Sequence, residues 1–324
     1  MQRSLILAVF LVFLSVNTQA WDDVGHKISA YIAWQRMTPT ARENVVRILR
    51  SAPEDSNLAA FYQSYGATPE LQRKKEFFMF TATWADVVRD RAFENRYKKY
   101  HKSNWHYDDT FWRQNGNAAV PLTGFAEGGQ AVDRLMEFDR TIRDSGASDR
   151  DKAIAIAWIM HLIGDLHQPL HTSARVTDLE PKGDQGGNLF HLTPQGTPRE
   201  QQQNLHWFWD SIVVRATPPK TGEFSERDYI EPVAERMMKR HPFASVSGNL
   251  KPGDYRALQQ ESFAYNPTVV FSPDLVRFQA PSAKYRRNAY DLAERQLALA
   301  GYRMAEIFNS VFGTAPAAPA PRAQ

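Results

Sequence analysis

The sequence contains no cysteine among its 324 residues. The protein therefore has no disulfide bond, no cysteine nucleophile, no iron–sulfur cluster and no thiolate ligand for zinc. Any metal ion that it holds must be bound through nitrogen and oxygen atoms.

The chain also lacks a strong excess of charge and long apolar segments. Its 39 lysines and arginines against 36 aspartates and glutamates leave a net charge of +3. A total this small does not by itself predict nucleic-acid binding, which requires clustered positive charge. After residue 20, no segment approaches the ~18 consecutive apolar residues of a membrane span. The content of 43% hydrophobic and 12% aromatic residues indicates a globular protein with a large core.

The first twenty residues have the pattern of a secretory signal peptide. Arg3 precedes an apolar run over residues 5–16, and Thr18 and Ala20 place small residues where cleavage requires them. The run is too short to span a bilayer, which makes an anchored helix the less favoured interpretation. We expect cleavage after Ala20, a mature chain that begins at Trp21, and a secreted or periplasmic location.

The rest of the chain is predicted to be mainly helical. Apolar residues recur at helical spacing over 21–49 and over 289–311, and Ser148 is a candidate N-cap for a helix that ends before Pro169. The stripe over 289–311 is typical of a core helix of about six turns. Alternating strand patterns are scarce. Loops are expected at residues 114–118, 179–188, 194–203 and 245–255.

No shift in composition marks an internal domain boundary. We therefore expect a signal peptide over 1–20, a single all-α domain over 21–313, and a disordered tail rich in proline and alanine over 314–324. No obligate protein partner is inferred.

Histidines and aspartates recur at a spacing that suits a metal ion. His161 and Asp165 are four residues apart, as are His206 and Asp210, so the members of each pair leave the same face of a helix. Imidazole nitrogen and carboxylate oxygen together suit Zn²⁺. A single buried histidine is more often a core residue than a ligand. Two His–Asp pairs, each surrounded by Ile, Leu or Trp residues, favour the interpretation as metal ligands. A buried, charged carboxylate is costly unless a cation or hydrogen bonds offset its charge.

Other positions are compatible with the same chemistry. Asp86 ends an apolar stretch, with Arg89 one turn later, and His106 lies between two aromatic residues. Taken alone, each of these two segments is more typical of an ordinary helix end than of a metal site. A free α-amino group has a pKa near ~8, so the amine and carbonyl of Trp21 would form a metal chelate close to His26.

In this order along the chain, the motifs resemble those of the S1/P1 nuclease family. They are Trp21, Gly25-His26, Trp84-Ala85-Asp86, Trp105-His106-Tyr107, His161 with Asp165, Gln168-Pro169-Leu170-His171, Gly186-Gly187-Asn188, and Asn204-Leu205-His206 with Asp210. The resemblance extends more loosely to Phe312. It implies a secreted, helical, trizinc enzyme with the fold of P1 nuclease and zinc phospholipase C. Such an enzyme cleaves single-stranded DNA and RNA to 5′-phosphorylated products and removes 3′-phosphates from nucleotides.

The resemblance also implies a role for each site residue. The first zinc would bind Asp86, His106, His161 and Asp165; the second would bind the amine and carbonyl of Trp21, His26 and the shared Asp165; the third would bind His171, His206 and Asp210. Asp165, which bridges two metals, and Arg89, which contacts phosphate, would be catalytic. Tyr107 would stack on a base, and Asp109 would hydrogen-bond its edge.

Two alternatives to a nuclease are open. A zinc phospholipase C shares nearly all of these ligands but typically ends its set with Glu, where this chain has Asp210. A secreted zinc- or nucleic-acid-binding protein without catalysis is the other. Plant and fungal members of the family carry disulfides, and their absence here suggests a bacterial-type member.

Overall fold

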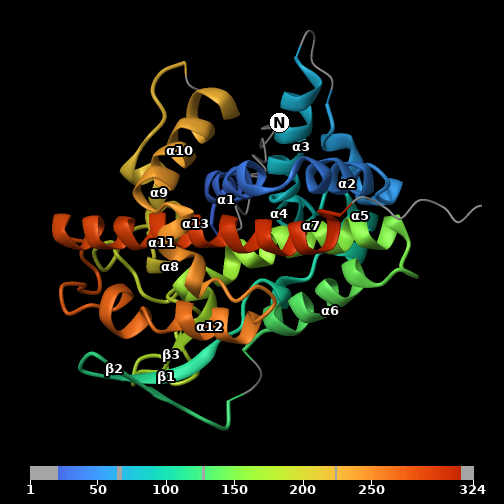
Figure 1. Cartoon of the computed structure of the whole chain (residues 1–324). Helices are drawn as coiled ribbons and strands as arrows, with labels where there is room; N and C mark the ends of the chain where they lie inside the picture. Colours follow the sequence, from blue (N-terminus) through green and yellow to red (C-terminus); the bar gives the residue numbers. More distant parts are fainter. Residues whose placement is uncertain (1–20, 64–67, 126–127, 223–224, 315–324) are drawn as a thin grey trace, which may run out of the picture.

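The computed structural model describes residues 21–63, 68–125, 128–222 and 225–314 (Figure 1). The expected signal peptide, and the expected tail beyond residue 314, lie outside these residues. The described chain contains thirteen α-helices and one three-stranded sheet. The all-α class predicted from the sequence is thereby confirmed, with the small sheet as an addition.

The helices differ widely in length. They are α1 (Asp23–Arg36), α2 (Pro39–Leu49), α3 (Glu70–Thr81), α4 (Trp84–Val87), α5 (Glu94–Tyr100), α6 (Ala131–Arg143), α7 (Asp149–Leu166), α8 (Leu205–Asp210), α9 (Ile212–Ala216), α10 (Glu231–Arg240), α11 (Phe243–Val246), α12 (Tyr255–Phe263) and α13 (Ala283–Phe312). Two short 3-10 helices, η3 (Ser103–Trp105) and η4 (Pro169–Thr172), complete the elements that build the site.

Helix α13 crosses the whole molecule, with α1 and α7 beside it (Figure 1). Its apolar stripe is buried, as expected of a core helix, and the helix begins six residues before the predicted stretch. Gly301 permits the close approach of α1, since a Cβ there would lie 2.6 Å from both the Ser29 carbonyl oxygen and the Ile32 Cβ. None of the described helices combines the length and apolar character that a bilayer crossing requires.

The N-terminal segment predicted to be helical forms two helices. Met37 has an extended backbone, and the Thr38 hydroxyl accepts a hydrogen bond from the Ala41 amide at 3.1 Å. Pro39 occupies the first turn of α2, where its missing N–H is not needed. The break turns the chain so that α1 packs on α13 and α2 packs on α7.

The start of α7 agrees with the sequence prediction. The Ser148 hydroxyl accepts a hydrogen bond from the Asp151 amide at 3.2 Å and caps the helix. Helix α7 is buried along most of its length and ends at Leu166. Pro169 then opens η4, so the chain changes direction between two groups of histidines.

The small sheet was not predicted from the sequence. Strand β1 (Thr110–Asn115) pairs with β2 (Ala118–Pro121) in an antiparallel hairpin, whose turn is the loop expected near residue 116. Strand β1 also pairs in parallel with β3 (Ser173–Arg175), directly after η4. This pairing holds the segment that ends in His106 and Tyr107 beside η4, where the Asp108 amide donates to the His171 carbonyl at 2.9 Å.

Candidate active site

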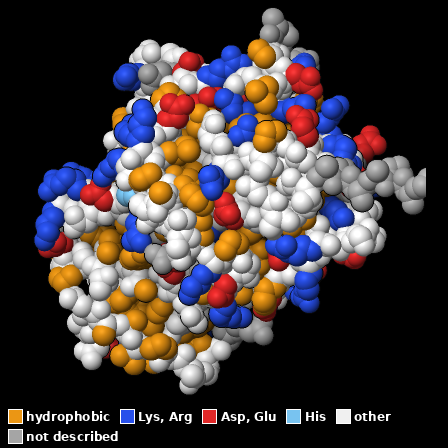
Figure 2. Space-filling model, in the orientation of Figure 1, with side chains coloured by type: hydrophobic (Ala, Val, Ile, Leu, Met, Phe, Trp, Pro, Cys, Tyr) orange, Lys and Arg blue, Asp and Glu red, His pale blue; other side chains and the backbone are white. Residues whose placement is uncertain are grey.

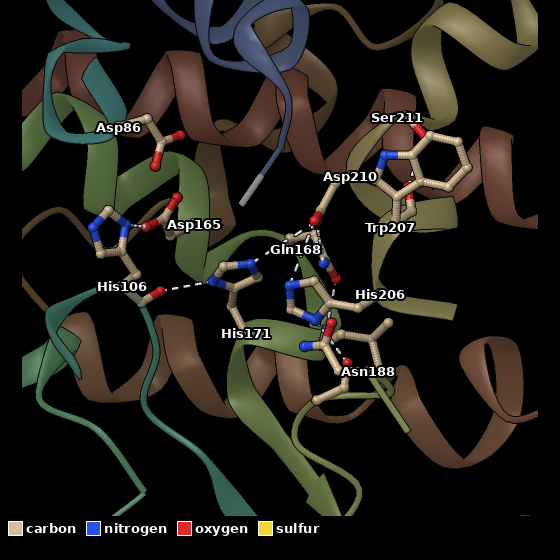
Figure 3. Close-up of polar contacts among 12 residues, drawn as sticks. Asp86, His106, Asp165, Gln168, His171, Asn188, His206, Trp207, Asp210 and Ser211 are labelled. Atoms are coloured by element: carbon tan, nitrogen blue, oxygen red, sulfur yellow. Dashed lines mark hydrogen bonds and ion pairs between the residues drawn. The ribbon is translucent and has the colours of Figure 1, made fainter. Parts of the chain in front are cut away.

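Nine residues predicted to bind metal converge from six segments of the chain. They are Trp21 ahead of α1, His26 in α1, Asp86 in α4, His106 after η3, His161 and Asp165 in α7, His171 in η4, and His206 and Asp210 in α8. Each is at most 6% exposed. Figure 3 shows Asp86, His106 and Asp165 on one side of the site, and His171, His206 and Asp210 on the other.

Asp165 lies at the centre of the first group. Its Oδ2 lies 3.1 Å from Nδ1 of His106 and 3.4 Å from Nε2 of His161. Its Oδ1 lies 3.3 Å from Nε2 of His26. The two oxygens of one carboxylate thus face different imidazoles, an arrangement that suits a ligand shared between two cations.

Asp86, which lies in α4, is the remaining member of the first group. Its Oδ2 lies 3.8 Å from Nε2 of His161, and ligand atoms of His26, Asp86 and His161 fall within 4.8 Å of one another. The same is true of His106, His161 and Asp165. Because His161 belongs to both sets, the two predicted zinc sites of this side are adjacent.

The second group consists of His171, His206 and Asp210. Nε2 of His171 lies 3.9 Å from Asp210 Oδ1, and Nε2 of His206 lies 3.5 Å from Asp210 Oδ2. The three ligand atoms again fall within 4.8 Å. These three residues are the ones predicted from the sequence to bind the third zinc ion.

Backbone carbonyls orient three of the imidazoles. The Nδ1–H groups donate to backbone oxygens: His161 to Ala82 at 2.8 Å, His171 to His106 at 2.7 Å and His206 to Gly186 at 2.7 Å. Such a bond fixes the tautomer and points Nε2, with its lone pair, toward the carboxylates. Each carbonyl belongs to another segment, so the fold itself sets the geometry of the ligands.

Many polar atoms of the two groups are buried without a hydrogen-bond partner. They include both ring nitrogens of His26, Oδ2 of Asp86, Nε2 of His106, Oδ1 of Asp165, Nε2 of His171 and Oδ2 of Asp210. A buried polar atom without a partner is costly, and such atoms gathered at one place require an explanation. Cations bound by these nitrogens and oxygens would satisfy them, so the residues fit the metal ions that the sequence predicts.

Burial also shapes the charge of the site. Desolvation lowers the pKa of His26 and His206 to about 4 and that of His161 to about 3, so these imidazoles are neutral at pH 7. Desolvation raises the pKa of Asp165 and Asp210 well above the usual range. Neutral imidazoles have free lone pairs, and the carboxylates require positive charge nearby to remain ionised.

Gly164 gives His26 its place between α1 and α7. A Cβ at position 164 would lie 2.7 Å from Nδ1 and 3.0 Å from Cε1 of His26. The His26 ring is fully buried and stacks on His161, with 4.0 Å between the ring centroids. The imidazole therefore occupies space that every residue other than glycine would fill.

Trp21 is fully buried beside these groups. The amide of the next residue, Asp22, donates to the Asp210 carbonyl at 3.0 Å, which ties the start of the described chain to the ligand helix α8. The chelate through the Trp21 amine stays a prediction, because the free amine exists only after cleavage.

A cavity of about 380 Å³ opens beside the imidazoles of His106, His171 and His206. Arg89 and Tyr107, both predicted from the sequence, line it. The Arg89 guanidinium also lies 2.9 Å from Asp86 Oδ1, so the same group touches a ligand carboxylate and the cavity.

Asp109 also lines the cavity. Burial, together with the nearby Asp184 and Asp108, raises its pKa well above the usual range. Its Oδ1 is buried and has no hydrogen-bond partner. A protonated carboxyl here has a hydrogen bond to offer to a ligand.

Gln168 contacts the site, although no role was predicted for it from the sequence. Its Nε2 donates to Asp210 Oδ1 at 2.8 Å, and its Oε1 accepts from the Leu170 amide at 2.7 Å. Its position in the Gln168–His171 motif was the only signal. Four of the nine histidines are not predicted ligands. One of them, His167, is a buried residue bonded to Ile163 and Arg303.

A helical fold that gathers buried imidazoles and carboxylates beside an open cavity has the donor groups of a metal-dependent hydrolase. Comparison with known sequences names the class: a model of the S1/P1 nuclease family matches residues 21–313, and the chain belongs to this family. Nuclease P1 of Penicillium citrinum is 22% identical over 304 residues, which cover 91% of this chain and 98% of that protein. Nuclease S1 of Aspergillus oryzae is 22% identical over 316 residues, or 94% and 96% of the two chains. The protein is thus a nuclease, a phosphodiester hydrolase.

Proposed function

We propose that the protein is a secreted, zinc-dependent endonuclease that hydrolyses single-stranded DNA and RNA to 5′-phosphorylated products and removes 3′-phosphates from nucleotides. The observation that carries the proposal is the gathering of the eight histidine and aspartate ligands into buried groups beside one cavity. His106, His171 and His206 line that cavity together with Arg89, Tyr107 and Asp109. The signal-peptide pattern of residues 1–20 supports export.

Three zinc ions are the proposed cofactors. Asp86, His106, His161 and Asp165 would hold the first; Trp21, His26 and Asp165 the second; and His171, His206 and Asp210 the third. When bound, Zn²⁺ supplies Lewis acidity, which makes water a better nucleophile near pH 7 and offsets the negative charge of a phosphodiester. The all-nitrogen and oxygen donor set and the buried atoms without partners support this assignment.

Arg89 is the proposed phosphate ligand of the protein itself. Its guanidinium presents several N–H donors in a fixed plane, and this geometry matches two oxygens of a phosphate. The contact with Asp86 at 2.9 Å holds the group at the rim of the metal cluster. Arg89 would therefore position the phosphodiester against the cluster and stabilise the charge that grows in the transition state.

Tyr107 and Asp109 would bind the base. An aromatic ring accepts any base by stacking, worth about 1–3 kcal/mol, with little dependence on sequence. The raised pKa of Asp109 means that its carboxyl holds a proton and can donate it to a hydrogen-bond acceptor on the base edge. Bases paired in a duplex cannot lie flat on the Tyr107 ring, which favours unpaired strands.

Substitution of Asp165 by asparagine tests the proposal. Chelated and zinc-restored protein, and the D165N variant, would be assayed for release of acid-soluble nucleotides from single-stranded DNA and RNA. We expect no hydrolysis without zinc, recovery when zinc is restored, and a loss of about a hundredfold or more in D165N, because this one carboxylate would hold two of the proposed metals.

Substitution of Glu294 by glutamine provides the matched control. Glu294 is a fully buried carboxylate of α13 that pairs with Arg240 and does not line the cavity. We expect E294Q to hydrolyse as wild type does. Near-normal turnover by D165N would contradict the proposal, and release of phosphocholine in place of nucleotides would support the phospholipase C alternative.

A further inference from the structure

A second cavity, of about 370 Å³, lies between helices α8 and α9 and the first turns of α13. Three arginines, Arg215, Arg286 and Arg287, line it together with the aromatic rings of Phe208 and Tyr290. No carboxylate is among its lining residues. We call these five residues the arginine groove.

Two of the three arginines of the arginine groove carry a positive charge that no ion pair with a described residue neutralises. In the described part of the chain, no carboxylate lies within ion-pair distance of Arg286 or Arg287. Arg286 donates to the Pro281 carbonyl at 2.9 Å, and Arg215 Nε donates to the Ser211 hydroxyl at 2.7 Å. Figure 2 shows basic side chains gathered at the left edge of the molecule, over the end of α13 that carries residue 283.

The basic segment that contains Lys98 and Lys99 differs from the arginine groove, because its charges are paired. Lys98 lies beside Glu94, and Lys99 lies 2.6 Å from Asp55. Both lysines are thus paired with carboxylates on the surface. Arg286 and Arg287, in contrast, have no carboxylate of the residues that the structure describes within ion-pair distance, so their charge is available to a ligand.

An exposed tryptophan borders the arginine groove. Trp207 is 39% exposed, and the Arg215 guanidinium lies 4.0 Å from the centroid of its ring. Figure 3 shows its indole on the side of α8 away from His171 and Asp165. Arg215, which contacts the Trp207 ring, also lines the cavity that holds Arg286 and Arg287. An exposed aromatic ring next to this basic cavity combines the two features that bind single-stranded nucleic acid, a stacking surface and positive charge.

Helix α8 links the arginine groove to the catalytic cavity. His206 lines that cavity, Trp207 is the next residue, and Phe208 lines the groove. Asn204 caps α8 through the Trp207 amide at 2.8 Å and also bonds to Asn188, another residue of the catalytic cavity. The six residues of α8 rise only about 9 Å. A strand that occupied both cavities would therefore pass around this short helix, beside Trp207.

We propose that Trp207 and the arginine groove form an extended binding site for single-stranded nucleic acid, which holds nucleotides beyond the scissile bond. Trp207 would stack on a base, and Arg286 and Arg287 would contact phosphates. The inference rests on the proposed nuclease function and adds a substrate preference: long strands are cleaved more efficiently than dinucleotides, in a salt-dependent way.

The test compares a dinucleotide with a long single-stranded oligonucleotide on wild type, R286Q/R287Q and W207A. We expect kcat/KM for the long strand to fall about tenfold in R286Q/R287Q and about fivefold in W207A, with the dinucleotide unchanged. The slope of log kcat/KM against log salt should decrease by about 1.4 in R286Q/R287Q, since each phosphate contact on a single strand contributes about 0.7.

The double variant R140Q/R150Q is the matched control, because it removes the same charge from exposed positions that line neither cavity. An equal loss in this control, or an equal loss on the dinucleotide, overturns the inference. So does an unchanged preference for long strands in R286Q/R287Q.

Failure of the nuclease proposal gives a different result. Wild type would then hydrolyse neither substrate, and fluorescence anisotropy of a labelled oligonucleotide on the same four proteins would test the groove alone. Tighter binding by wild type than by R286Q/R287Q supports the inference, and equal binding overturns it.

Discussion

The space that Gly164 leaves for His26 makes a sharp prediction about the proposed zinc cluster. In the variant Gly164→Ala, the new Cβ meets Nδ1 of His26 at 2.7 Å, which is closer than side chains approach one another. The imidazole cannot move freely, because it is fully buried and stacked on His161. Either the His26 ring or the backbone of α7 next to Asp165 must shift.

Two opposing effects set the expected change in the free energy of unfolding of Gly164→Ala. Alanine is favoured over glycine inside a helix by about 1 kcal/mol, whereas overpacking a core costs about 1–3 kcal/mol. We therefore expect the free energy of unfolding of the metal-free protein to fall by up to about 2 kcal/mol. The affinity for zinc should fall further, by about 10- to 100-fold for the ion that His26 would bind, as it does when ligand orientation is disturbed.

The assay combines competition for zinc against a chromophoric chelator with denaturant unfolding. Gly301→Ala is the control, since its Cβ would clash at 2.6 Å with Ser29 and Ile32 of α1, away from the ligands. It should destabilise the protein but bind the full complement of zinc. Wild-type zinc affinity in Gly164→Ala would refute the placement of His26 in the metal cluster.

Two further predictions concern the chain start and a buried acid. Retention of one residue ahead of Trp21 converts the amine into an amide, so we expect one zinc ion fewer by elemental analysis and loss of hydrolysis; full activity would contradict the chelate. Burial raises the pKa of Asp184 to about 6, so the native state keeps a proton that the unfolded chain releases, and this contribution to stability is lost as pH rises from about 4 to 6. Asp184→Asn should therefore gain up to about 3 kcal/mol relative to wild type between pH 4 and pH 7 in denaturant unfolding; a constant difference would contradict the assignment.

Helix caps and apolar stripes could be predicted from the sequence, because they depend on residues close together along the chain. Ser148 caps α7 as its hydroxyl and position suggest, and the stripe of α13 is buried. The break between α1 and α2 was missed, although Pro39 is typical of a first helical turn. The sheet was missed because its strands are short and β3 joins β1 from far along the chain.

Site residues also divide into those that spacing along the chain predicts and those that depend on contacts between distant segments. The four-residue spacing in α7 and α8 was enough to predict the pairs around Asp165 and Asp210. Asp86 and His106 had no such local signal and depended on the family resemblance. The role of Gln168, the clearance at Gly164 and the arginine groove depend on contacts between distant segments, which spacing along one chain does not reveal.

The ligand cluster also connects parts of the chain that no covalent link joins. Its residues lie between positions 21 and 210 in a protein without a single thiol. Metal ions bound there would act as removable cross-links, and the stability of the fold would rise with the logarithm of the free ion concentration. Such cross-links need no oxidising compartment, and under the proposed function the lifetime of the exported protein would depend on the supply of zinc.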